Sequence, residues 1–250
     1  MVCSYFYFKV KGGIKMLQLR STNDRGTTKL GWLNSRHTFS FADYYDPAQM
    51  GFGDLRVIND DIIAPKEGFA AHRNNNMEIV TVMLSGSLEY KDNMDNKNLL
   101  LPGEIQRVSA GTGVIHSEYN PSLTKPAHVL HIWIVPDKKN LLPDCELKTF
   151  PRSELFNNIC LIVSQGGKKG SLHINQNINI YQMILEEARP VLFNLSMGRM
   201  IWVQIAQGSA EVNSLYLKAG DGLAITDEMG VAEIKALEDQ TNILIFEMFS

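Results

Sequence analysis

Residues 78–90, EIVTVMLSGSLEY, contain the pattern that decides the fold: a β-branched apolar run, a Ser-Gly-Ser turn and a second short run. Val, Ile and Thr favour extended strands and Gly permits a tight turn, so this pattern predicts a β-hairpin. Further short runs follow on both sides of the turn Pro102-Gly103-Glu104. Apart from a fragment near residues 153–157, no segment shows helical periodicity, so we expect an all-β protein.

The same pattern recurs in residues 201–221, IWVQIAQGSAEVNSLYLKAGD. Each copy has an apolar run, a Gly-Ser turn, a second run and a Gly-acid turn. The two turn glycines of the first copy, Gly86 and Gly103, are 17 residues apart, and those of the second, Gly208 and Gly220, are 12 residues apart. The repetition therefore predicts an internal duplication of one β-barrel unit, with a shorter tip in the second copy.

The boundary between the two barrels is expected between Pro136 and about Pro151, where the segment PDKKNLLPD (136–144) supplies two prolines and a charge cluster. We therefore assign one barrel to residues 16–140 and the other to residues 141–250. Residues 1–15 are expected to be an N-terminal extension, because Met16 opens a segment, MLQLRSTNDRG, that reads like a natural start.

Composition and charge exclude several classes of protein. A net charge of -3 gives no basic field for a phosphate backbone, so direct nucleic-acid binding is not expected. No apolar run is long enough to span a membrane. The three cysteines, Cys3, Cys145 and Cys160, fit neither a disulfide framework nor a metal knuckle. We expect reduced thiols, a cytoplasmic location and a monomer.

A metal site is indicated in the first barrel by His116-Ser117-Glu118, which follows the turn 110–113, AGTG. Alternate residues of a strand face the same way, so His116 and Glu118 would both point into the barrel. His72, 44 residues upstream, could complete a two-histidine, one-carboxylate set of the kind that holds non-haem iron. The spacing alone also allows a hydrogen-bonded His-Glu pair without a metal.

Several motifs resemble the pirin family of two-barrel cupins. The likeness is specific from Met16 to Pro143 and weaker from there to the C-terminus. The matching segments are GWL (31–33), HTFSF (37–41), YYDP (44–47), LRVINDD (55–61), MEI (77–79) and SAGTG (109–113) with His116-Ser117-Glu118.

The resemblance implies a bicupin, that is, two double-stranded β-helix (jelly-roll) barrels, of which only the first binds metal. In the family, three histidines and one glutamate hold one divalent transition metal; Fe(II) is favoured, with Zn, Ni, Mn or Co as alternatives. His72, His116 and Glu118 match three of these positions, but the second histidine is replaced by Asn74, a weaker ligand. His131 could restore an imidazole from another strand, or could be an ordinary core histidine.

The resemblance also implies a function. The leading hypothesis is a quercetin 2,3-dioxygenase-type oxygenase that opens the ring of a flavonol or similar enol with dioxygen, with Glu118 as a metal ligand and a base. The competing hypothesis is a non-catalytic, metal-binding regulator with a degenerate site, which Asn74 favours. A cupin isomerase or a sugar-binding protein is a third class. The aromatic run from Phe39 to Tyr45 fits a flavonoid pocket or a packed core.

Overall fold

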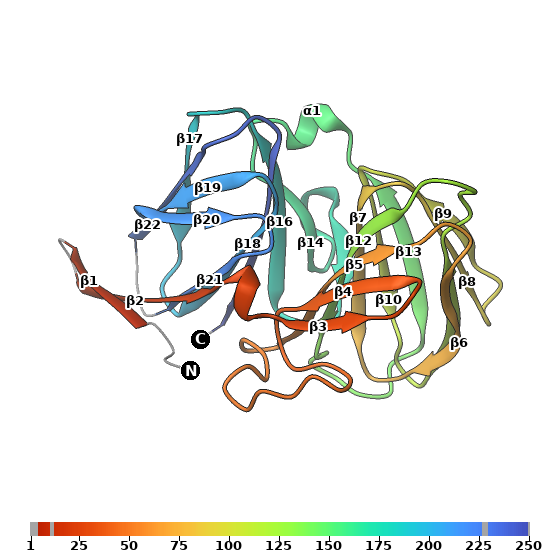
Figure 1. Cartoon of the computed structure of the whole chain (residues 1–250). Coiled ribbons are helices and arrows are strands. Elements are labelled where there is room, and N and C mark those ends of the chain that lie inside the picture. Colours follow the sequence, from red (N-terminus) through yellow and green to blue (C-terminus); the bar gives the residue numbers. More distant parts are fainter. Residues whose placement is uncertain (1–4, 11–12, 227–229, 250) are drawn as a thin grey trace. The chain divides into compact units, whose positions relative to one another are not determined.

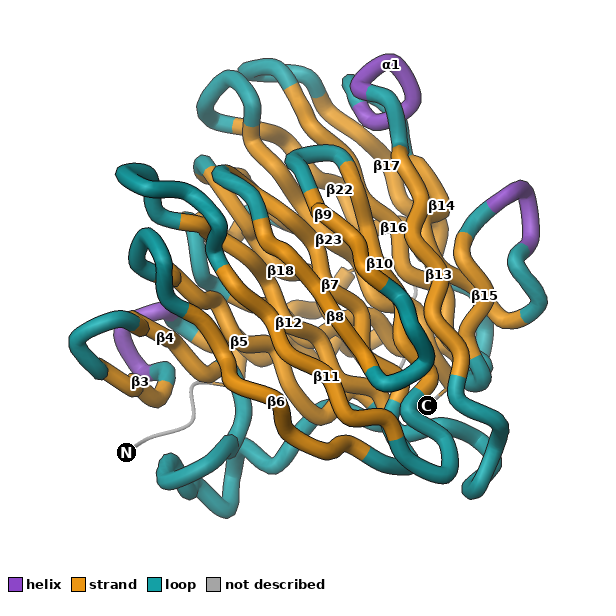
Figure 2. The backbone as a smooth tube through the Cα atoms, turned by 90° about the vertical axis from the view of Figure 1, so that its right-hand side faces the viewer, coloured by secondary structure: helices purple, strands orange, loops and turns teal. Residues whose placement is uncertain are grey.

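The computed structural model describes residues 5–10, 13–226 and 230–249. Strands make up most of the described backbone, and the helical segments are short (Figure 2). The prediction of an all-β protein is therefore confirmed. Among the described residues, no helix has the length and apolar content needed to cross a membrane. The chain forms two compact units (Figure 1): unit 1 contains residues 1–25, 152–163 and 177–250, and unit 2 contains residues 26–151 and 164–176.

Unit 2 contains two antiparallel sheets, with strand orders β13-β10-β7-β12-β5-β4-β3 and β6-β11-β8-β9. Its strands are β3 (Gly26–Lys29), β4 (Leu33–His37), β5 (Leu55–Ile63), β6 (Gly68–Asn74), β7 (Glu78–Ser85), β8 (Leu88–Asp92), β9 (Lys97–Leu100), β10 (Glu104–Ser109), β11 (Val114–Tyr119), β12 (Ala127–Ile134), β13 (Asp144–Thr149) and β15 (Leu172–Ile174).

Unit 1 likewise contains two sheets, ordered β1-β2-β21-β18-β23-β16-β14 and β17-β22-β19-β20. Its strands are β1 (Tyr5–Val10), β2 (Gly13–Arg20), β16 (Ile178–Leu185), β17 (Pro190–Leu195), β18 (Arg199–Gln207), β19 (Ser209–Val212), β20 (Leu215–Lys218), β21 (Gly222–Thr226), β22 (Gly230–Ala236) and β23 (Thr241–Phe249). Strand β14 (Cys160–Gln165) runs from the sequence of unit 1 into that of unit 2. The short helices are η1 (Thr22–Asp24), α1 (Arg152–Leu155) and η2 (Lys168–Gly170).

The hairpin predicted in residues 78–90 is wrong, although both of its strands form. β7 pairs with β10 and β12, whereas β8 pairs with β9 and β11 of the other sheet. The turn therefore carries the chain from one sheet to the other. Gly86 is required there, because its φ is +78° and a Cβ would lie 2.5 Å from the carbonyl oxygen of Pro126.

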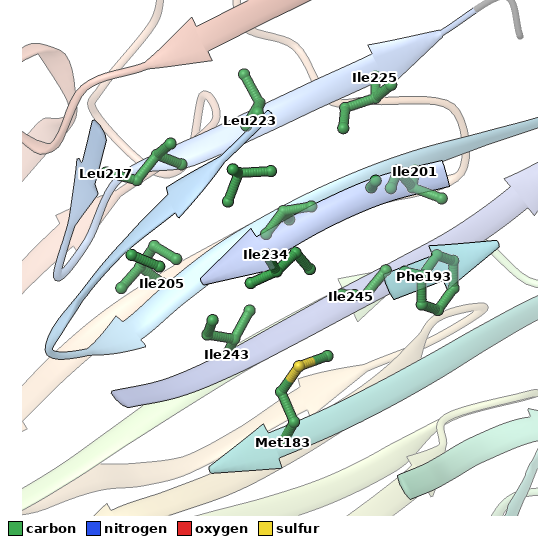
Figure 3. Close-up of a cluster of buried hydrophobic side chains, with 14 of the residues drawn as sticks. Met183, Phe193, Ile201, Ile205, Leu217, Leu223, Ile225, Ile234, Ile243 and Ile245 are labelled. Atoms are coloured by element: carbon green, nitrogen blue, oxygen red, sulfur yellow. The ribbon is translucent and has the colours of Figure 1, made fainter. Parts of the chain in front are cut away.

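The core of unit 1 is a cluster of buried aliphatic side chains between its two sheets (Figure 3). Ile201, Ile205, Ile243 and Ile245 point into it from β18 and β23, and each is fully buried. Alternate positions on these strands supply the cluster, as period-two packing requires. A separate buried cluster fills unit 2.

The predicted domain boundaries remain a prediction. In the structure, residues 164–176 group with the first barrel and residues 16–25 with the second, whereas the sequence placed one boundary at residue 140. The predicted extension, residues 1–15, lies partly outside the described residues, as does Cys3. Its described strand β1 pairs with β2. Within the described part of the chain, Cys145 and Cys160 form no disulfide.

The buried cluster of unit 1 yields a stability prediction. Ile205→Ala should lower the free energy of unfolding by about 2–5 kcal/mol, because it leaves a cavity among fully buried side chains. Met197→Ala, at a side chain that is 76% exposed, should change it by less than about 0.5 kcal/mol. Urea denaturation measures both. Equal effects of the two substitutions would contradict this description of the core.

Candidate metal centre

The first barrel encloses a cavity of about 320 Å³ whose wall brings together four of the predicted site residues: His72, His116, Glu118 and His131. They come from β6, β11 and β12. Most of the remaining wall is apolar, including Phe41, Phe69 and Trp133. The cavity has the composition of a small-molecule site, with a few polar groups placed in an apolar pocket.

Strand β11 places its functional side chains by simple alternation. Val114, His116 and Glu118 are buried and face inward, whereas Ile115 and Ser117 face outward. In the antiparallel ladder, His116 pairs with His72 of β6. The inward direction of His116 and Glu118 was predictable, but their register against β6 is set by a long-range pairing.

The two imidazoles meet through their Nε2 atoms, which are 3.0 Å apart. His72 donates its Nδ1–H to the carbonyl oxygen of Ala70 at 2.9 Å, so in the neutral ring Nε2 carries a lone pair. Two lone pairs at this distance repel unless a proton or a cation lies between them. Cis ligands at about 2.1 Å from one metal ion are about 3.0 Å apart, so the pair fits a shared metal.

Asn74, which the sequence analysis placed as a weak ligand, contacts His116 but is not part of the cavity wall. Its Nδ2 lies 3.1 Å from His116 Nε2. A rotation of the amide would turn its Oδ1 toward the same point, and that oxygen is a neutral donor to a metal. The side chain is 9% exposed, and His72 is exposed at the mouth of the cavity.

Glu118 is held from the opposite side by His131. Nε2 of His131 lies 3.0 Å from Glu118 Oε2, at an angle that makes the contact an ion pair rather than a hydrogen bond. Nδ1–H of the same ring donates to Asp61 Oδ2 at 2.6 Å. His131 is thus clamped between two buried carboxylates, which are 6% and 1% exposed.

The charges of this trio follow from its geometry. Burial lowers the pKa of His131, but the carboxylates of Glu118 and Asp61 outweigh it and raise the pKa to about 10. Burial raises the pKa of Glu118, but the neighbouring histidines, His131 first, lower it to about 2. His131 is therefore an imidazolium with no lone pair, and Glu118 is a carboxylate.

His116 has the protonation state that a ligand needs. Burial lowers its pKa, and the charge of Glu118 only partly offsets this effect, so the ring is neutral near pH 7. Its Nδ1 has no hydrogen-bond partner in the described part of the chain. Metal-binding histidines usually donate this proton to a supporting group, as His72 does.

No three His, Cys, Asp or Glu side chains in residues 5–10, 13–226 and 230–249 form a ready-made metal cage. Two contacts agree with this finding: Asn74 occupies the place of a ligand histidine beside His116, and Glu118 is paired with His131. The His72–His116 pair nevertheless fits one metal ion, and Glu118 faces the same cavity. The sequence analysis did not identify Asp61 as a partner of His131. The feature that could have indicated it is the pair of polar residues, Asn59 and Asp61, on one face of an otherwise apolar strand.

Several other sequence expectations concern residues near the cavity. Phe39 is buried, whereas Phe41 lines the cavity, so the aromatic run serves both packing and pocket. His37 also lines it, with Nδ1 2.7 Å from Asn59 Oδ1. Glu78 is buried away from the cavity wall and accepts hydrogen bonds from Ser109 and Asn175.

Two antiparallel barrels of duplicated topology, one with inward imidazole and carboxylate groups, define the chain as a bicupin. It belongs to the pirin family: residues 18–134 match the family model for pirin, and residues 161–248 match that for the quercetinase C-terminal cupin domain. The expectations of a bicupin and of this family are therefore confirmed.

Individual relatives agree with this assignment. The chain is 40% identical over 233 residues to the quercetin 2,3-dioxygenase of Escherichia coli (strain K12), covering 93% of this chain and 99% of the relative. It is 35% identical over 233 residues to a pirin-like protein of Caulobacter vibrioides, covering 92% and 99%. The crystal structure of the bacterial pirin YhhW from Escherichia coli, in complex with nickel(II), matches with a TM-score of 0.88 and 40% identity, covering 94% and 99%.

The charge on His131 should make stability depend on pH in metal-free protein. Its pKa is raised in the folded state from 6.5 to about 10, so its proton stabilises the fold below about pH 6.5, and this contribution is lost as the pH rises through 10. Urea denaturation between pH 6 and about 10 should show a steeper fall for wild type than for His131→Gln. Glu89→Gln, at a partly exposed carboxylate that pairs with Lys91 away from the cavity wall, should behave like wild type. Equal slopes in wild type and His131→Gln would contradict the charged trio.

Proposed function

We propose that this chain is a pirin-type, metal-dependent oxygenase, which binds one divalent transition metal ion and opens the ring of a flavonol or similar enol with dioxygen. The observation that carries the proposal is the approach of His72 and His116 through their Nε2 atoms, 3.0 Å apart, in the wall of an apolar cavity. The nickel(II) complex of the related bacterial pirin supports a divalent metal, and the name of the Escherichia coli relative supports the reaction.

The metal ligands in this proposal are His72, His116 and Glu118, with Asn74 in the fourth position. The bound cation would acidify the enol hydroxyl and provide a binding place for dioxygen. Fe(II) is favoured by the two-histidine, one-carboxylate set, while Ni, Mn, Co and Zn suit the same donors. The apolar walls at Phe41 and Trp133, whose rings meet edge to face at 5.5 Å, suit a flat aromatic substrate and exclude water.

Glu118 is the residue that would accept the enol proton. A carboxylate whose pKa is about 2 takes a proton only from an acidic donor, so this role requires an enol acidified by the cation. His131 acts as a positioning residue, because its imidazolium holds Glu118 Oε2 and is itself held by Asp61. A protonated His131 does not replace the missing imidazole; that replacement would require the loss of its proton.

A second candidate function is a non-catalytic, metal-binding regulator or protein-binding bicupin. Two observations favour it: the weak donor Asn74 lies beside His116, and Glu118 is already neutralised by His131. A site that satisfies its own carboxylate gains less from a metal ion than a site with an uncompensated charge. Metal content and turnover, measured on one sample, separate this candidate from the oxygenase.

Metal affinity should respond to the residue at position 74. Asn74→His should raise the affinity by about tenfold or more, because imidazole is the better donor to divalent transition metals. Competition with a chromophoric chelator measures this change.

The metal content of the protein should depend on His116. His116→Ala should lose most bound metal, whereas His128→Ala, whose ring pairs with Asp60 outside the cavity wall, should keep it. Unchanged stoichiometry in His116→Ala would refute the site, and full occupancy in His131→Ala would exclude that ring as a ligand.

Turnover should depend on Glu118. Protein purified from unsupplemented medium should contain near-stoichiometric iron, nickel, manganese or cobalt, and an oxygen electrode should record uptake with quercetin. Glu118→Gln, reloaded to equal metal content, should lower kcat/KM by about 10²–10⁴-fold if Glu118 is the base, whereas Glu89→Gln should not. Absent metal, or zinc without oxygen uptake, would favour the regulator instead.

A further inference from the structure

The second barrel contains a cavity of its own, which the proposed metal centre does not use. Its volume is about 430 Å³, within the range of roughly 300–1,000 Å³ that small-molecule sites occupy. In contrast to the cavity of the first barrel, its wall is mainly polar. The polar side chains in the wall are Asn179, Tyr181, Asn194, Ser196, Arg199 and Glu247.

Strand alternation places this cavity at one end of the apolar core. On β23, Ile243, Ile245 and Glu247 occupy successive positions of one face, and the two isoleucines belong to the core. Asn179 of β16 pairs with Glu247 in the ladder. The carboxylate is therefore an inward side chain at the end of a barrel, and it is only 6% exposed.

The duplication relates this cavity to that of the first barrel. Ile79 and Ile201 each lie seven residues before the glycine of the repeated Gly-Ser turn. Trp133 pairs with Ile79 in the first barrel, and Glu247 pairs with Ile201 in the second. Trp133 lines the first cavity and Glu247 the second, so corresponding positions face both cavities. An aromatic wall in one barrel is replaced by a carboxylate in the other.

Glu247 is held ready as a hydrogen-bond acceptor. Asn179 Nδ2–H and Tyr181 O–H both donate to Oε2, at 2.8 and 3.2 Å. Both bonds use the same oxygen, so Oε1 remains as an acceptor for a bound molecule. Burial and the charge of Glu247 raise the pKa of Tyr181 to about 12, so its hydroxyl stays a donor.

Arg199 supplies donors from another part of the same wall. Its guanidinium donates to the backbone oxygen and to Oδ1 of Asn177, at 3.1 and 2.9 Å, and stacks over the ring of Phe249 at 4.1 Å. These contacts fix the group and use two of its five N–H donors. With Glu247 it brings one positive and one negative charge to the cavity, which therefore has no net charge from this pair.

We propose that this second cavity binds a neutral, polyhydroxylated molecule of about monosaccharide size. Neighbouring hydroxyls can donate hydrogen bonds to Glu247 and accept them from Arg199 and Asn194. A ligand that only donates or only accepts could not satisfy both sides of the cavity. Phe193 and Leu192 add apolar wall for the C–H face of such a molecule. The balanced charges disfavour a ligand with a net charge. The site is independent of the metal and of the flavonol chemistry.

Isothermal titration calorimetry on the full chain tests this site, with D-glucose, D-galactose, D-xylose and myo-inositol as probes. At least one probe should bind saturably with one-to-one stoichiometry. Glu247→Gln should weaken that binding by about tenfold or more, because a charge-assisted hydrogen bond is lost. Tyr181→Phe should weaken the binding by a smaller factor, and this variant tests the site if Glu247→Gln fails to fold. Glu211→Gln, at an exposed carboxylate of the same barrel, and His116→Ala, in the other barrel, should bind like wild type.

Several results would overturn the proposal. One is the absence of saturable binding for all four probes. Another is unchanged affinity in folded Glu247→Gln and Tyr181→Phe. Cyclohexanol binding as tightly as the polyols would show that hydroxyl recognition is absent, and tighter binding of phosphate or ethanolamine would show a charged ligand class. Loss of metal binding or of oxygen uptake affects none of these results, so failure of the proposed oxygenase is distinguishable from failure of this site.

Discussion

The antiparallel pairing of β6 with β11 is the constraint on which the candidate metal centre depends. It sets His72 opposite His116 and brings Asn74 within 3.1 Å of the same ring. Two imidazole nitrogens at 3.0 Å cannot both present lone pairs without a proton or a cation between them, so the pairing requires either a hydrogen bond from one ring to the other or a shared metal ion. A one-residue slip of this register would turn every one of these side chains to the opposite face.

A positive charge is already present in the barrel. His131, between Glu118 and Asp61, is an internal cation that satisfies the carboxylate. This arrangement lets a buried glutamate remain ionised at a lower cost to the fold than an unpaired buried charge would carry. It also weakens the electrostatic attraction for a metal ion, and Asn74 weakens the ligand set further. The chain thus keeps the pirin framework, and the metal affinity proposed for it is lower than that of a site with a third histidine and an unpaired carboxylate.

The duplicated barrels show how one topology supports two chemistries. The core positions repeat, because both barrels must bury alternate aliphatic side chains between two sheets. The positions at the end of the core are free to differ. In one barrel they carry Trp133 beside a histidine and carboxylate group, and in the other they carry Glu247 beside an amide, a phenol and a guanidinium. The shared fold therefore does not determine which side chains line the cavity of each barrel.

The sequence by itself determined the all-β class, the duplication, the family and the shared inward face of His116 and Glu118. These features are local, because strand propensity, turn glycines and the two-residue period act over a few residues. Only the tertiary structure decided that β7 and β8 join different sheets, that Asp61 and Glu118 clamp His131, and that Glu247 faces a second cavity. Each of these depends on pairing between strands distant in sequence, and that pairing is selected by burial of the whole barrel rather than by any local pattern.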